Sequence, residues 1–339
     1  MRLKNLAGLG ALAVLVSLVA LAGVESAVAE PSQWKREWKK TNFKIHSVDY
    51  SSIKSGGPPK DGIPPIDDPQ FVDIAEVENI ADTEPVIGLI VNGEARAYPL
   101  YVMIWHEIVN DTIGGVPVAV TFCPLCNAAM VFDRRVGGRT LDFGTTGKLR
   151  KSDLVMYDRQ TESWWQQFLG EAIVGKMTGK RLKMLPSRLE SFARFKARVE
   201  SGKVLVPNSN RLRRYGINPY VNYDSSARPF LYDGPLPTTV APLSRVISLG
   251  KRGAWSFGLL RRVREVRLDD GVVIRWESGQ NSALDTAIIA EGMDVGNVVV
   301  QRMKDGQPED VVHSVDFAFA YRAFYPDAPI HVEWPKTPG

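Results

Sequence analysis

Cysteine and histidine are scarce in this chain, which has two cysteines and four histidines among 339 residues. Both cysteines, Cys123 and Cys126, belong to one Cys-Pro-Leu-Cys motif. A bridge between such close neighbours closes a very short loop and restricts the unfolded chain little, so the pair is not typical of a structural disulfide. Pairs with this spacing are usually redox-active or metal-binding. Thiol chemistry is therefore expected at a single motif.

Two further features are missing after the first 29 residues. No apolar run approaches the ~20 residues needed to span a bilayer, and no block of five or six like charges occurs. The net charge of +4 is too small to favour a nucleic-acid partner. Short basic clusters such as residues 261–264 are interpreted as solvated faces.

The first 29 residues have the features of a signal peptide. Arg2 and Lys4 form a basic start, residues 6–24 form an apolar run, and Ala27-Val28-Ala29 is a small-x-small cleavage site. An uncleaved membrane anchor is the alternative. We expect a mature chain that is periplasmic or secreted, with no stable transmembrane segment after cleavage.

The rest of the sequence predicts a mainly β (α+β) fold with short helices. We expect a polar N-terminal arm at residues 30–45, one large domain at 46–330 and a C-terminal tail at 331–339. Residues 246–260 echo residues 86–100, since both read as strand, glycine turn, strand and apolar helix start. The domain is therefore predicted to consist of two weakly similar halves, at about 70–200 and 235–330.

Hairpin geometry predicts a partner for the first cysteine. Gly114-Gly115 is a natural two-residue turn, which would pair Ile113 with Val116 and continue the ladder until His106 faces Cys123. Directly opposed residues have Cβ atoms about 4.5–5.5 Å apart, close enough for imidazole and thiol to touch. A bulge or a longer turn would separate them.

A Pro- and Gly-rich loop at residues 56–69 precedes this hairpin. Its prolines fix φ, its glycines allow close approach, and its charged residues could contact a ligand. We interpret it as a substrate loop with Lys60, Asp61 and Asp67 as its polar groups. The alternative is a rigid surface loop that only packs.

Several segments carry specific motifs: residues 56–65, 97–100, 105–111, 114–126, 154–164, 215–220 and 317–326. Together they resemble the domain-of-unknown-function 3179 family, over roughly residues 45 to 330. The resemblance implies an exported prokaryotic protein of unsettled activity. Family members keep the first cysteine and often have Thr at the second, which implies that Cys123 and His106 form the common core and that Cys126 is an addition.

A metal site is the first chemical interpretation of the motif. Thiolate, imidazole and thioether groups select soft transition metals, and such a set leans towards copper, with zinc as the other candidate. The predicted ligands are Cys123, Cys126, His106 and Met130, although a methionine at such a position is more often simply a core residue.

Two other interpretations stay open, so the sequence leaves undecided whether the protein is an enzyme. Cys123 could be a nucleophile, with His106 as its base and Glu107 as an orienting group, acting on a small molecule. Thiol–disulfide exchange is a variant of this idea, although the long helix of a thioredoxin site is missing after Cys126. Alternatively, the cysteines are a structural pair in a binding or scaffold module, and the sequence defines no protein partner.

Overall fold

The computed structural model describes residues 31–208 and 213–334. The predicted signal peptide at residues 1–29 and the end of the predicted tail lie outside these ranges. Within them, none of the helices has both the length and the apolar character needed to cross a membrane. The described chain is mainly β-structure with five short α-helices, as the sequence predicts.

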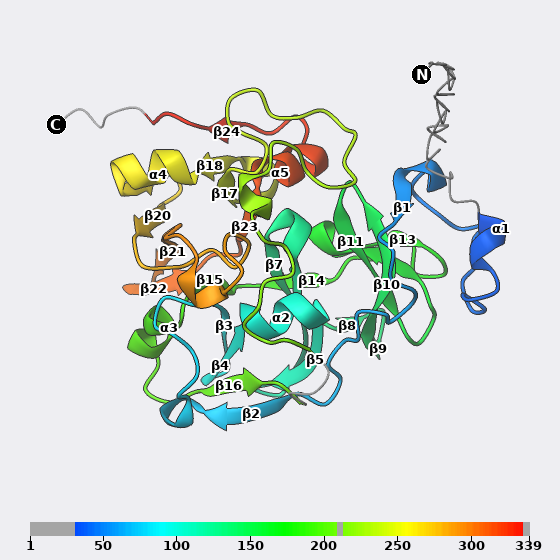
Figure 1. Cartoon of the computed structure of the whole chain (residues 1–339), viewed down its shortest axis with the longest axis horizontal. Coiled ribbons are helices and arrows are strands. Elements are labelled where there is room, and N and C mark those ends of the chain that lie inside the picture. Colours follow the sequence, from blue (N-terminus) through cyan, green and yellow to red (C-terminus); the bar gives the residue numbers. More distant parts are fainter. Residues whose placement is uncertain (1–30, 209–212, 335–339) are drawn as a thin grey trace, which may run out of the picture.

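Two copies of one strand-and-helix pattern form the centre of the fold (Figure 1). In the first copy, a hairpin and a seven-residue helix lead into a three-stranded meander. A later strand–helix–strand unit returns to the hairpin, with one strand antiparallel and the other parallel to it. The elements of this copy are β3 (Pro85–Val91), β4 (Glu94–Pro99), α2 (Leu100–His106), β5 (Ile108–Ile113), β6 (Val116–Cys123), β7 (Ala128–Asp133), β15 (Arg188–Ser191), α3 (Phe192–Arg198) and β16 (Lys203–Val206).

The second copy repeats this order with the same strand directions. Its returning unit again places one strand antiparallel to the hairpin and one parallel to it. Both seven-residue helices of the hairpins end at a residue with positive φ, Glu107 at 59° and Arg264 at 64°. The two copies thus share one element order and one set of strand directions. The elements are β17 (Arg245–Ser248), β18 (Ala254–Ser256), α4 (Phe257–Val263), β19 (Glu265–Arg267), β20 (Val272–Glu277), β21 (Asn297–Lys304), β23 (Ser314–Phe317), α5 (Ala318–Phe324) and β24 (Ile330–His331).

The first copy also carries a long insertion between β7 and β15. Most of it forms a separate five-stranded sheet in the order β1-β10-β11-β12-β13, whose edge strand comes from the N-terminal region. The elements outside the two copies, some of them beyond the insertion, are α1 (Pro31–Trp34), β1 (Ile53–Ser55), β2 (Gln70–Asp73), β8 (Arg135–Val136), β9 (Arg139–Thr140), β10 (Phe143–Arg150), β11 (Asp153–Asp158), β12 (Trp164–Gln166), β13 (Glu171–Val174), β14 (Lys183–Leu185) and β22 (Gln307–Asp310).

The hairpin turns lie where the sequence predicts them. Gly114 and Gly115 both have positive φ, and Ile113 pairs with Val116. Asn92 and Gly93 likewise form the turn between β3 and β4. The two-residue turn sets the register of this hairpin. β6 itself is buried on both faces, because every residue from Val118 to Cys123 is buried.

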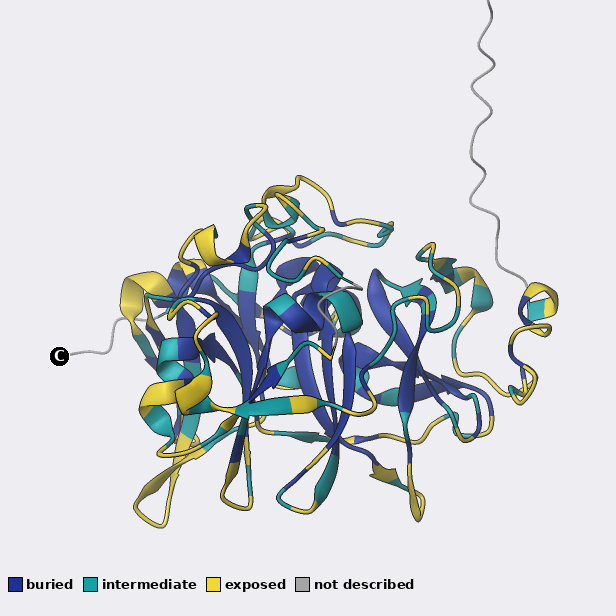
Figure 2. Cartoon of the chain, turned by 60° about the horizontal axis from the view of Figure 1, so that its bottom comes forward, coloured by how far each residue is buried: buried dark blue, intermediate teal, exposed yellow. Residues whose placement is uncertain are grey.

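One hydrophobic cluster runs through both copies and the insertion. The burial view shows its strands as a continuous buried interior, with exposed residues at the hairpin tips (Figure 2). The N-terminal arm, which the sequence predicts to be polar, also has buried apolar side chains. Trp34 and Trp38 belong to a second hydrophobic cluster and lie beside Trp164. Burial of these two tryptophans holds the arm against the five-stranded sheet.

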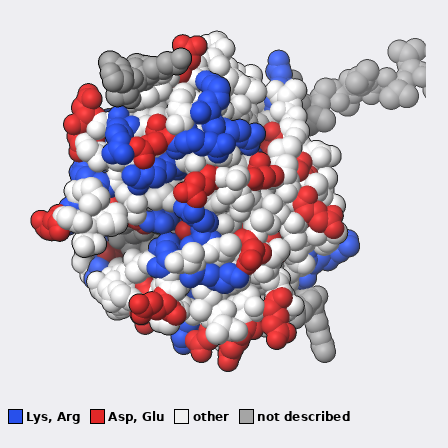
Figure 3. All heavy atoms as spheres, turned by 90° about the vertical axis from the view of Figure 1, so that its left-hand side faces the viewer, with Lys and Arg blue, Asp and Glu red and all other residues white. Residues whose placement is uncertain are grey.

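The charged side chains on the face that carries α4, β20 and β22 are mixed in sign (Figure 3). Asp270 pairs with Arg252 and Arg302, both at 2.5 Å, and Glu265 pairs with Arg275 at 2.7 Å. Several arginines of this face are therefore paired with carboxylates, whereas Arg261 and Arg262 donate to backbone carbonyls. This mixture of charges is in keeping with a solvated face.

Candidate functional site

The Cys-Pro-Leu-Cys motif forms the turn between two central strands. β6 ends at Cys123, a single 3₁₀ turn covers Pro124–Cys126, and β7 begins at Ala128 opposite Cys123. Asn127 closes the turn with a φ of 51°, a left-handed conformation that asparagine tolerates better than most residues. No long helix follows, so the geometry differs from a thioredoxin site as the sequence predicts.

Both thiols lie over the neighbouring β10–β11 turn. The Ser152 carbonyl accepts from Cys126 Sγ at 3.5 Å and from Cys123 Sγ at 3.9 Å. Lys151 and Ser152 both have positive φ, so the chain reverses in two residues and starts β11 with Asp153 directly below the sulfur atoms.

Asp153 completes a compact group of three donors with the two cysteines. One donor atom from each residue lies within 4.8 Å of the others, and all three residues are buried. One oxygen, Oδ2, accepts from Gln166 Nε2 at 2.6 Å and from the Phe168 amide at 3.0 Å. The other, Oδ1, is buried without a hydrogen-bond partner in the described chain. An unpartnered buried carboxylate oxygen is costly, which marks this atom as one that a ligand could satisfy.

Burial disfavours the ionised forms of these acids. It raises the pKa of Asp153 to about 7 and the pKa of both thiols above its usual range. A second buried carboxyl near Cys126, that of Asp316, has its pKa raised well above the ordinary value by the same cause, and it accepts from Ser314 Oγ at 2.7 Å. The site therefore gathers several acidic groups in a low-dielectric interior without a salt-bridge partner among the described residues.

The predicted contact between His106 and Cys123 is wrong. The β5–β6 register is as expected, but the ladder stops short of His106, which is the last residue of α2. Its ring nitrogens instead lie 2.7 Å from the Pro64 carbonyl and 2.7 Å from the Tyr215 hydroxyl. The positive φ of Glu107 breaks the strand between helix and ladder, so pairing arithmetic cannot be carried through it.

Met130 is also outside the three-donor group. It is buried in β7 and lines a different cavity of about 260 Å³, which His313 and Phe132 share. Its place in the core matches the alternative that the sequence left open for it.

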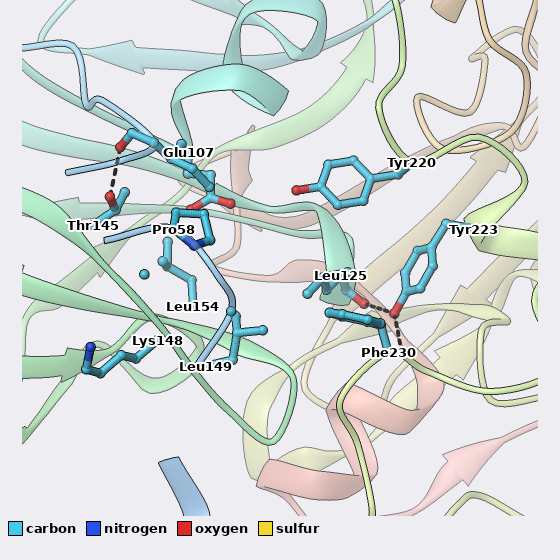
Figure 4. A pocket seen from close by; sticks show the side chains of 13 residues that line it. Pro58, Glu107, Leu125, Thr145, Lys148, Leu149, Leu154, Tyr220, Tyr223 and Phe230 are labelled. Atoms are coloured by element: carbon cyan, nitrogen blue, oxygen red, sulfur yellow. Dashed lines mark hydrogen bonds between the residues drawn. The ribbon is translucent and has the colours of Figure 1, made fainter. Parts of the chain in front are cut away.

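Glu107 lies in the wall of an apolar cavity near the cysteines. This cavity, of about 290 Å³, is lined by the 56–63 loop, by β10 and β11, and by the segment that connects the two copies (Figure 4). The connecting segment contributes Tyr220, Tyr223 and Phe230. Burial raises the pKa of Glu107 to about 8, with a smaller contribution from Asp153, so this carboxyl lies near the three-donor group.

The connecting segment is tied directly to the cysteine turn. The Tyr223 hydroxyl donates to the Leu125 carbonyl at 3.0 Å and accepts from the Phe230 amide at 3.2 Å. Ser152 Oγ donates to the Phe230 carbonyl at 2.5 Å. The cavity and the cysteine turn therefore form one structural unit.

The predicted substrate loop reaches the cavity, but through other residues than those expected. Gly56, Pro58 and Ile63 line it. Lys60 binds Glu162 at 2.8 Å, and Asp61 accepts from the Tyr157 hydroxyl at 2.5 Å. Asp67 accepts from Asn110 Nδ2 at 2.8 Å and pairs with Arg159. These three polar side chains hold the loop in place.

Sequence reasoning missed Asp153, Tyr220 and Tyr223. Asp153 had a signal, since it is an acidic residue at the start of the apolar run 154–157 and so predicted to be buried. The tyrosines lie in a loop-rich segment whose path over the site only the tertiary structure defines.

No curated protein and no solved structure matches the chain. The model of one family, described as "Protein of unknown function (DUF3179)", matches residues 60–328. That match covers both copies, the insertion and the candidate site, and the chain belongs to the DUF3179 family.

Proposed function

We propose that this protein binds one thiophilic transition-metal ion through Cys123, Cys126 and Asp153, and that zinc fits the site best. The observation that carries the proposal is the grouping of three donor atoms within 4.8 Å of one another at a buried position. Cysteine thiolates and carboxylates are both ordinary zinc ligands.

The charge of the site supports a cation. Burial disfavours the ionised forms of these acids, and a divalent ion would favour them. Such an ion would displace the thiol protons and take up the unpartnered Oδ1 of Asp153.

The donor set favours zinc over copper. His106 and Met130, the soft ligands that would lean towards copper, lie elsewhere, and a hard carboxylate stands in their place. Three protein ligands would leave a fourth tetrahedral position for water or another molecule.

A nucleophilic role for Cys123 has less support. The attacking species is the thiolate, and burial raises the pKa of this thiol. The predicted base His106 is bonded to Pro64 and Tyr215 instead. We also propose that the metal binds after export to the periplasm or the medium, on the strength of the leader sequence at residues 1–29.

The proposal is tested by elemental analysis of protein expressed in medium replete with zinc and copper and purified with reductant. We expect near-stoichiometric zinc in the native chain. Cys123→Ser, Cys126→Ser and Asp153→Asn should each reduce zinc affinity by about tenfold or more, since even outer-shell changes cost about 10–100-fold.

His106→Gln and Met130→Leu are the matched controls and should keep the metal. Metal-free native protein would overturn the proposal, and recovery of both cysteines as a disulfide without reductant would then favour a thiol-redox site. A loss of zinc in His106→Gln as large as in Cys123→Ser would overturn the ligand assignment.

A further inference from the structure

The cavity beside the cysteine turn has the size and the lining of a small-molecule site. Its volume of about 290 Å³ is at the lower end of the usual range of about 300–1,000 Å³. Aliphatic and aromatic groups from four separate parts of the chain line it (Figure 4). They are Pro58, Ile63, Leu125, Leu149, Leu154 and Phe230.

Most polar side chains of the lining are already engaged. The Thr145 hydroxyl donates to the Ile63 carbonyl at 2.8 Å, and the Tyr223 hydroxyl is held by Leu125 and Phe230. The Lys148 ammonium points away from the cavity (Figure 4) and lies 5.7 Å from the ring of Trp164.

Two polar groups are left to face a ligand. The Glu107 carboxyl and the Tyr220 hydroxyl point towards each other across the cavity (Figure 4). Neither side chain has a hydrogen-bond partner among the described residues. Glu107 is buried and Tyr220 is partly buried. Two unsatisfied groups that converge on one point are typical of the end of an apolar pocket that fixes a ligand's orientation.

The charges around the cavity select the polar group of the ligand. Burial raises the pKa of Glu107 to about 8 and the pKa of Tyr220 above its ordinary value, so both are O–H donors near neutral pH. With the Lys148 ammonium turned away, the lining offers no cation to an anionic ligand. Two neutral donors fit one neutral acceptor oxygen.

We infer that this cavity binds a small uncharged molecule with an aliphatic or aromatic body, whose single carbonyl or hydroxyl oxygen lies between the Glu107 and Tyr220 side chains. This site needs no metal at the cysteine cluster, so it stands even if the proposed metal site fails.

Four probes with one phenyl ring test the inference by saturation-transfer NMR titration, on protein with chelator and on protein with zinc. Acetophenone carries the carbonyl, and ethylbenzene is nearly its isostere without the oxygen. Benzoate and benzylammonium carry the two charges. We expect acetophenone to bind at least several-fold more tightly than each of the others.

Substitutions locate the binding. Tyr220→Phe should weaken acetophenone by about 3- to 10-fold, as expected for one hydrogen bond, and leave ethylbenzene unchanged. Tyr232→Phe is the matched control on the same segment, because its hydroxyl bonds to the Pro235 carbonyl and lies outside the cavity lining. Leu149→Trp should fill the cavity and abolish binding, while Leu249→Trp, in the other cavity, should not.

Three results would overturn the inference. They are an absence of binding by acetophenone, equal binding of acetophenone and ethylbenzene with no effect of Tyr220→Phe, and binding that persists in a folded Leu149→Trp protein. Circular dichroism of each variant verifies the fold, and the hydroxyl substitution serves as the test where the larger one does not fold.

Discussion

Asp153 is the residue on which the proposed metal site depends most. The two cysteines alone supply a pair of soft donors, and only the carboxyl below them makes a three-donor group. Its geometry is fixed by Gln166 and the Phe168 amide, which hold one oxygen and leave the other free. Hydrogen bonds to the carboxylate oxygen that does not bind the metal orient the other oxygen and tune its basicity.

Glu107 makes the metal-free protein sensitive to pH. Its pKa is about 8 in the folded chain against an ordinary 4.5, so between these values the folded state holds a proton that the unfolded state has lost. Because the folded state binds more protons there, the free energy of unfolding falls as pH rises. Each unit of difference between the folded and unfolded pKa corresponds to about 1.4 kcal/mol. The free energy of unfolding is therefore unaffected by Glu107 below about pH 4.5 and is lowered by a few kcal/mol above about pH 8.

Urea unfolding of the metal-free protein at pH 5 and pH 8 measures this effect. We expect Glu107→Gln to lose less stability between the two pH values than the native chain, because the amide stays neutral. Glu200→Gln changes an exposed residue in the same way and serves as control. An unchanged pH dependence in Glu107→Gln would contradict the assignment.

At the scale of the elements, the 56–63 loop is held against β10 by backbone contact. The Gly56 amide donates to the Gly147 carbonyl at 2.8 Å, and Gly147 sits at a register shift in β10 with a φ of 68°. A Cβ on Gly147 would lie 1.9 Å from the Pro58 carbonyl oxygen, so loop and strand could not keep their present distance.

Gly147→Ala should therefore destabilise the protein far more than its φ alone requires. Gly138→Ala is the matched control, because Gly138 has a φ of 74° and nothing within 4 Å of the added Cβ. The left-handed conformation costs a non-glycine residue about 1–2 kcal/mol, which is the loss expected in the control. Thermal unfolding measures both, and an equal loss in the two variants would mean that the loop moves away freely.

At the scale of the whole molecule, the two copies are interlocked. The Ser191 amide donates to Asn297 Oδ1 at 2.7 Å, and Arg188 pairs with Asp310 at 2.5 Å. Near the cysteines, Asn127 Nδ2 donates to the Val315 carbonyl at 3.2 Å. The largest hydrophobic cluster joins the copies, and each copy adds a smaller cluster between its hairpin and its returning helix.

We expect the protein to unfold in one cooperative transition. Since both copies share the core, loss of one exposes the buried face of the other. Tryptophan fluorescence and far-ultraviolet circular dichroism should give the same urea midpoint, and zinc should raise both midpoints together. Two separate midpoints would show that the copies fold independently.

The sequence by itself determined the class of fold, the two related halves, the hairpin turns and the motif at the centre of the site. These depend on local chemistry: glycine pairs that adopt positive φ, alternation of apolar residues, and the close spacing of Cys123 and Cys126. Only the tertiary structure decided what lies beside that motif. The break at Glu107 moved His106 away, the β10–β11 turn brought in Asp153, and the connecting segment brought in Tyr220. Contacts between segments distant in sequence leave no periodicity in the chain, because they depend on how separate elements pack and not on the preferences of any one of them.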